Sequence, residues 1–168
     1  QRIWARPETV KQMSSAERHK VPICEKESNK WLLSLSETVK WQPEGTRLVT
    51  MGDSEADIFE LFDHARTLET DLLIRAGQNR SVTEPEVGLL WDVVEKQPIA
   101  GHLKVQVSKC EEQPARQATV AVRYCSLMLR PPQHLRSQMK PLSLYAVFVQ
   151  EIDPPADVEP LCWLLLTT

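Results

Sequence analysis

The sequence predicts an α/β protein, and three features of its 168 residues carry this prediction. Several stretches place apolar residues three and four positions apart, which is typical of helices with one buried side. Residues 101–153 largely alternate apolar and polar side chains, which is typical of antiparallel strands. Between these features, a short apolar segment ends at a carboxylate, and a helical pattern follows at once.

The first helical pattern lies in residues 25–40, where Trp31, Leu32 and Leu35 share one side. A β-prone segment at residues 47–53 comes next, after the chain breakers Pro43 and Gly45. We expect it to be a buried strand that ends at its carboxylate.

Asp53 is that carboxylate, and it stands where ligands and catalytic groups tend to lie in open α/β sheets. The simpler interpretation is a polar residue between a strand and a helix. Ser54 and Asp57 have the spacing of a capping box, so we expect the helix to begin at residue 54. Asp57 is therefore interpreted as a cap and not as a metal ligand.

The next elements are shorter. Residues 71–75 are predicted to form a second strand, residues 77–80 a loop, and residues 88–97 a short helix. Within residues 101–153 the alternation changes phase, which predicts a bulge or a bend near Cys125. Residues 161–168 form a continuous apolar run, which predicts a strand buried on both faces.

The net charge of −3 hides a basic block. Residues 113–150 contain no Asp or Glu but several basic residues. This block predicts either a surface that contacts the DNA backbone or a solvated basic face. The block consists of Arg116, Arg123, Arg130, Arg136 and Lys140. The four cysteines form no C-x-x-C pair, so we expect free thiols in a cytoplasmic protein and no zinc site. No apolar run is long enough for a membrane span.

Four blocks resemble one family. Residues 51–61 (M-G-D-S-E-A-D-I-F-E-L) resemble the D-R-E-A-D-I-Y-E block of transposases of the IS-four group, typified by the Tn-five transposase. Residues 4–7 and 25–31 resemble that family's W-x-R-P and E-K-E-S-x-K-W, and residues 73–75 resemble its V-V-R strand. Residues 151–155 and 161–168 resemble its E-I-N-P-P and L-K-W-L-L-L-T. The resemblance covers nearly the whole chain, with the blocks in the family's order.

The resemblance implies a partial ribonuclease-H-like catalytic core with an antiparallel β-rich insertion. Residues 1–100 would belong to the core, 101–153 to the insertion and 154–168 to a returning core strand. In such DDE enzymes three carboxylates hold two Mg²⁺ (or Mn²⁺) ions for phosphoryl transfer on DNA. Asp53 would be the second catalytic, metal-binding carboxylate. Arg75 and Arg80 would contact DNA near the active site, and Trp163 would stack on a base turned out of the duplex.

The chain departs from the family at the other two carboxylates. Residues 1–52 contain no Asp, and the family's catalytic Glu would follow residues 161–168. The sequence therefore predicts a fragment of a cut-and-paste transposase that is inactive alone. Its partner would be transposon-end DNA, bridged by a homodimer of the intact enzyme at the bacterial nucleoid. The alternatives are a non-catalytic DNA-binding remnant and a β-rich protein with no role on nucleic acids.

Overall fold

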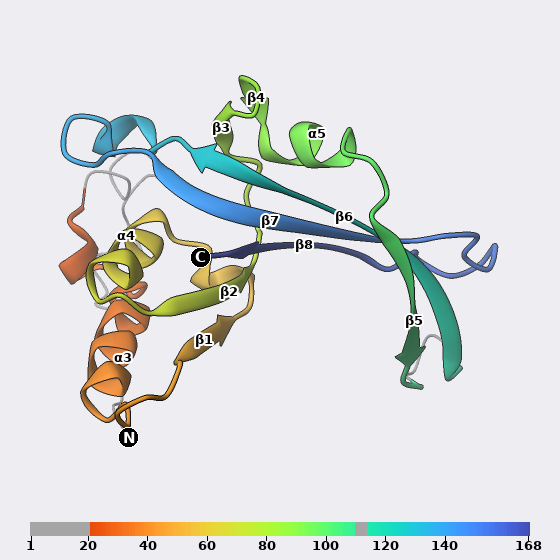
Figure 1. The fold of residues 1–168 in the computed structure, drawn as a ribbon, viewed down its shortest axis with the longest axis horizontal. Helices are drawn as coiled ribbons and strands as arrows, with labels where there is room; N and C mark the ends of the chain where they lie inside the picture. The colour runs from red at the N-terminus through yellow and green to blue at the C-terminus, as the bar shows by residue number, and fades with distance from the viewer. Residues whose placement is uncertain (1–20, 110–113) are drawn as a thin grey trace, which may run out of the picture.

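The computed structural model describes residues 21–109 and 114–168, and Figure 1 shows their arrangement. Eight strands form one sheet in the order β1-β2-β8-β7-β6-β3-β4, with β5 paired to β6 off this path. β1 and β2 run parallel, and the other paired strands of the described chain run antiparallel. The strands are β1 (Val49–Gly52), β2 (Asp71–Arg75), β3 (Ser81–Glu84), β4 (Gly88–Leu89), β5 (Gly101–Val107), β6 (Arg116–Leu129), β7 (Leu142–Glu151) and β8 (Cys162–Thr167).

In the described part of the chain, three α-helices accompany the sheet: α3 (Asn29–Lys40), α4 (Phe59–Thr67) and α5 (Leu90–Glu95). Short 3-10 turns lie at η1 (Ile23–Glu25), η2 (Ser54–Ala56) and η3 (Gln133–Leu135). The fold is thus mixed α/β with a mostly antiparallel sheet, which confirms the α/β class.

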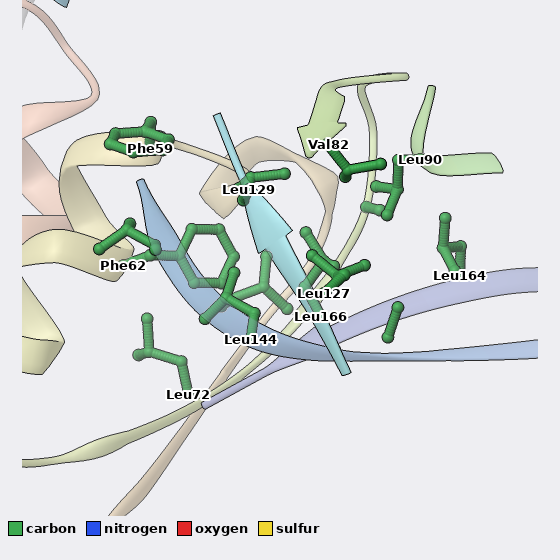
Figure 2. Close-up of a cluster of buried hydrophobic side chains, with 14 of the residues drawn as sticks. Phe59, Phe62, Leu72, Val82, Leu90, Leu127, Leu129, Leu144, Leu164 and Leu166 are labelled. Atoms are coloured by element: carbon green, nitrogen blue, oxygen red, sulfur yellow. The ribbon is translucent and has the colours of Figure 1, made fainter. Parts of the chain in front are cut away.

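One face of the sheet packs against the helices. Phe59 and Phe62 of α4 share a buried cluster with alternate residues of the strands, such as Leu72 of β2 and Leu164 of β8 (Figure 2). Because side chains alternate across a strand, the central strands β2, β8, β7 and β6 turn every second residue toward this covered face. At about 25 cal/mol per Å² of apolar area, this burial is the main favourable term for the fold.

The opposite side, the open face, carries the remaining side chains of these strands. Its half-buried residues, such as Leu73 and Leu165, do not belong to the core cluster. Met51 at its edge is 73% exposed. From β1 to β6, the open face includes Val49, Met51, Asp71, Leu73, Arg75, Trp163, Leu165, Thr167, Tyr145, Val147, Val149, Val122, Tyr124 and Ser126.

Several sequence predictions are confirmed. The strand at residues 71–75 is β2 with the same bounds, and the helix of residues 25–40 is present as α3. Leu35 is buried, and Trp31 and Leu32 pack against the core. The short helix within residues 88–97 is α5.

Two strand predictions are wrong in their burial. Among residues 21–109 and 114–168, the first strand, β1, is an edge strand: β2 pairs with one side of it, and its residues are exposed or half-buried. The apolar run at residues 161–168 forms β8, which is buried on the covered face only. A run of apolar letters reports hydrophobicity, but the number of covering layers depends on the rest of the fold.

The bulge predicted near Cys125 is also wrong. β6 pairs with β7 without a register shift from Val120 to Leu129. The phase change has another cause. Ala118 and Val120 lie on the same side of the sheet as the open face, but they are buried. The connection after β7 passes this end of β6: Glu151 opposes Val120, and its carboxylate accepts the N–H of Leu161.

β6 and β7 share one sheet and one core cluster with β2 and β8. The domain boundary near residue 101 therefore stays a prediction. In the described ranges, no helix is long and apolar enough to cross a membrane.

Candidate functional site

Asp53 follows β1 in an extended conformation (φ −78°, ψ −169°). Its Oδ1 accepts the backbone N–H of Glu55 at 3.0 Å, so Asp53 caps the 3-10 turn η2. The helix predicted to start at residue 54 begins only at Phe59, as α4. The capping-box prediction is wrong because Asp57 bonds to a different part of the chain.

Asp57 is buried and binds the loop that follows β2. Its Oδ2 accepts the N–H groups of Gly77 and Gln78, both at 2.9 Å. Its Oδ1 accepts Nε and Nη2 of Arg80 at 3.0 and 2.8 Å. A buried carboxylate needs such partners, and here they tie the turn after β1 to the loop after β2.

Two glycines allow these segments to lie close together. A Cβ on Gly52 would lie 2.6 Å from the Cβ of Ala56, and one on Gly77 would lie 3.0 Å from the Cβ of Ser54. Real Cβ atoms do not approach to 2.6 Å, so position 52 has no room for a side chain. The carboxyl ends of β1 and β2 therefore meet in one compact corner.

The strand register brings three of the predicted site residues to one face. Gly52 pairs with Ile74, so the next extended residue, Asp53, lies beside Arg75. Arg75 pairs in turn with Leu165 of β8, and Trp163 lies two residues further on the same side. Diagonal neighbours of this kind are about 7–8 Å apart.

Arg75 and Trp163 line one cavity of about 320 Å³. Asp157 and Glu159, in the connection that leads into β8, line it as well. Cys162 is also in this wall, and burial, followed by the charge of Glu95, raises the pKa of its thiol. The thiol is thus kept in its neutral form, which is the less reactive one.

Arg80 lies apart from the other predicted site residues. Its side chain is 8% exposed and bound to Asp57, and it lines a different cavity. The structure thus gives Arg80 an internal role, and its contact with DNA stays a prediction.

Two arginines of the basic block point in opposite directions. Arg116 pairs with the buried carboxylate of Glu151 on the side of the open face, whereas Arg123 lies over the ring of Phe148 on the covered face, 6.0 Å from its centroid. They do not form one basic surface, as the block suggested. Arg136 is exposed, and its Nε donates to the carbonyl oxygen of Pro131 at 3.4 Å.

Arg116 also perturbs the acid that it binds. Its hydrogen bond lowers the pKa of Glu151, against the opposing effect of desolvation. At the other end of the sheet, the hydrogen bond from Arg47 lowers the pKa of Asp71. Both carboxylates are therefore held in the charged form.

The described residues do not by themselves fit a two-metal site. No group of three His, Cys, Asp or Glu side chains in residues 21–109 and 114–168 is arranged to hold a metal ion. The acids nearest in sequence to Asp53 are engaged, Glu55 with Lys30 at 3.2 Å and Asp57 with Arg80. Mg²⁺ demands octahedral oxygen ligands, and this corner offers one such side chain.

The two buried ion pairs, Asp57–Arg80 and Arg116–Glu151, were not predicted from the sequence. The Asp57–Arg80 pair was not predicted, because the spacing of Ser54 and Asp57 already suggested that Asp57 caps a helix. Glu151 had a signal: it is the first acid after a long stretch with none, directly after a basic block. An acid at the end of an apolar strand in such a position suggests an internal partner for one of the arginines.

The fold and the site define a mixed α/β protein with a carboxylate, an arginine and a tryptophan at one end of a sheet that its helices cover on one face. No family model matches the sequence.

Proposed function

We propose that this chain is part of the catalytic region of a DDE transposase with a ribonuclease-H-like core. The observation that carries the proposal is the position of Asp53, Arg75 and Trp163 on one face, at neighbouring ends of β1, β2 and β8. The resemblance assigned these residues separately. Their common position is what one site acting on a DNA end requires.

The carboxylate position supports the core. Asp53 follows the parallel pair β1–β2, and ligands of α/β sheets commonly lie at the carboxyl ends of parallel strands. In the complete enzyme, Asp53 would be one of three carboxylates holding Mg²⁺ or Mn²⁺, and the other two would come from elsewhere. The described residues lack that set, so we derive no cleavage step and expect this chain to bind DNA without cutting it.

Arg75 and Trp163 support contact with a nucleotide. Arg75 is exposed, and its planar guanidinium matches the geometry of a phosphate. Trp163 can replace the stacking that a base loses when it leaves the duplex. Because Asp157 and Glu159 line the same cavity, it suits an uncharged base better than a phosphate.

The ligand would be transposon-end DNA, and the intact enzyme would work as a DNA-bridged homodimer at the bacterial nucleoid. A second candidate is a non-catalytic remnant that still binds DNA. The lone carboxylate at this corner is the observation that favours it. Mg²⁺-dependent cleavage of DNA by the proposed intact enzyme would separate the two, because a remnant that only binds DNA does not depend on the metal.

The test is fluorescence anisotropy with a labelled DNA hairpin between about 50 and 200 mM salt. We expect the affinity to fall steeply with salt, and Arg75→Ala to weaken it and reduce the salt slope by about one. Arg66→Ala is the matched control, since Arg66 is an exposed cation on the helix layer. Salt-independent affinity, or equal effects of the two variants, would refute the proposal.

A further inference from the structure

The open face carries both tyrosines of the sequence, and both are largely exposed. Tyr124 of β6 is 61% exposed and Tyr145 of β7 is 55% exposed. Neither belongs to the core cluster or packs against it. Two large aromatic rings in water on one sheet face are unusual, because burying such rings is strongly favourable.

The register places these rings as neighbours. Tyr124 pairs with Val147, and Tyr145 lies two residues from Val147 on the same strand and the same face. They are therefore diagonal neighbours, about 7–8 Å apart. Trp163 of β8 pairs with Val149, so it lies on the other side of Val147. Three aromatic side chains thus surround Val147 on three adjacent strands.

Arg75 supplies a cation at the edge of this group. None of the ion pairs of the described residues involves the exposed Arg75. Of the acids on the same side of the sheet, Asp71 binds Arg47 at 2.5 Å and Glu151 binds Arg116, whereas Asp157 and Glu159 line the cavity beside Trp163. A phosphate group outside that cavity could therefore pair with the exposed guanidinium of Arg75, while the cavity itself suits an uncharged base.

We infer that the open face is a stacking platform for unpaired nucleotides of single-stranded DNA. Tyr124, Tyr145 and Trp163 would each offer a ring to a base, and Arg75 would hold a phosphate. Exposed aromatic rings on a sheet are a sequence-tolerant way to bind single strands, since every base has a flat face. The inference goes beyond the proposed contact with a DNA end: it shares Arg75 and Trp163 with that contact and adds Tyr124 and Tyr145, which the proposed function does not use.

The test uses the chain as described here and a labelled oligothymidine of about 12 nucleotides, which cannot pair with itself. We expect Tyr124→Ala and Tyr145→Ala each to weaken binding between about five-fold and about a hundred-fold. Tyr124→Phe and Tyr145→Phe keep the rings and should bind nearly as well as the parent chain. Leu103→Ala, at a residue 60% exposed on β5, controls for loss of exposed apolar area.

Two results would overturn the inference. The first is unchanged affinity for oligothymidine in both alanine variants while their melting curves stay those of the parent. The second is a dimer, seen by sedimentation, that both alanine variants dissociate, because the rings would then serve a protein interface. The proposed function is judged separately. If hairpin binding depends on Arg75, the proposed function stands even when the stacking platform is refuted. If the chain binds oligothymidine normally but does not bind the hairpin, only the proposed function is rejected.

Discussion

The carboxylate of Asp57 holds the guanidinium of Arg80 through Nε and Nη2, at 3.0 and 2.8 Å. Both side chains are buried, and Asp57 also accepts the N–H groups of Gly77 and Gln78. The pair therefore joins the turn that begins at Asp53 to the loop that follows β2. The geometry of the candidate site depends on this internal ion pair.

Removing one partner should be costly, because the other is left as a buried charge. We expect Arg80→Ala to lower the free energy of unfolding by about 3–5 kcal/mol, measured by urea denaturation. Arg66→Ala removes an arginine from the exposed pair with Asp63 and should change the free energy of unfolding by less than about 1 kcal/mol. Equal losses in the two variants would contradict a special role for the buried pair.

Glu151 should make the protein sensitive to acid. Arg116 lowers its pKa in the folded state, so the unfolded chain binds the proton more tightly. The stabilisation is therefore present above the ordinary pKa of 4.5 and is lost as pH falls through the folded value. Melting temperatures between about pH 7 and pH 3 should fall less steeply for Glu151→Gln than for the parent.

Glu37→Gln is the control for this titration, because Glu37 forms an exposed pair with Lys40. Its profile should match that of the parent. The Glu151→Gln variant should keep some acid sensitivity, because Arg47 lowers the pKa of Asp71 as well. A Glu151→Gln profile identical to that of the parent would exclude Glu151 as a source of acid sensitivity.

Gly52 should not tolerate a methyl group. The added Cβ would lie 2.6 Å from the Cβ of Ala56 and 3.0 Å from Cδ1 of Ile74, so the backbone must shift. We expect Gly52→Ala to destabilise the fold by about 1–3 kcal/mol in urea denaturation. Gly101→Ala, which meets no atom within 4 Å, should be nearly neutral. A neutral Gly52→Ala would mean that the turn after β1 is not fixed against the strand.

Trp163 should contribute to DNA binding through its ring. We expect Trp163→Ala to weaken binding to a hairpin with one unpaired base by between about five-fold and about a hundred-fold, measured by anisotropy. Trp163→Phe should recover most of the affinity. Trp41→Ala is the control, because Trp41 is 83% exposed at the end of α3, and it should have no effect. The prediction fails if the two alanine variants behave alike.

Local patterns in the sequence were enough for most elements. The spacing of Trp31, Leu32 and Leu35 predicted α3, and the apolar run at residues 71–75 predicted β2. These predictions succeed because helix and strand periodicities are properties of neighbouring residues. The start of α4 failed, because the partners of Asp57 lie some twenty residues further along the chain.

By itself, the sequence determined the α/β class and the strand and helical pattern on either side of Asp53. Only the tertiary structure decided that β1 is an exposed edge, that Arg80 binds Asp57, and that Arg116 and Arg123 point to opposite sides of the sheet. It also brought Arg75 and Trp163 to one cavity, although they are far apart in the chain. The physical reason is that periodicity is local, whereas strand order and register join distant segments and thereby decide which side chains meet.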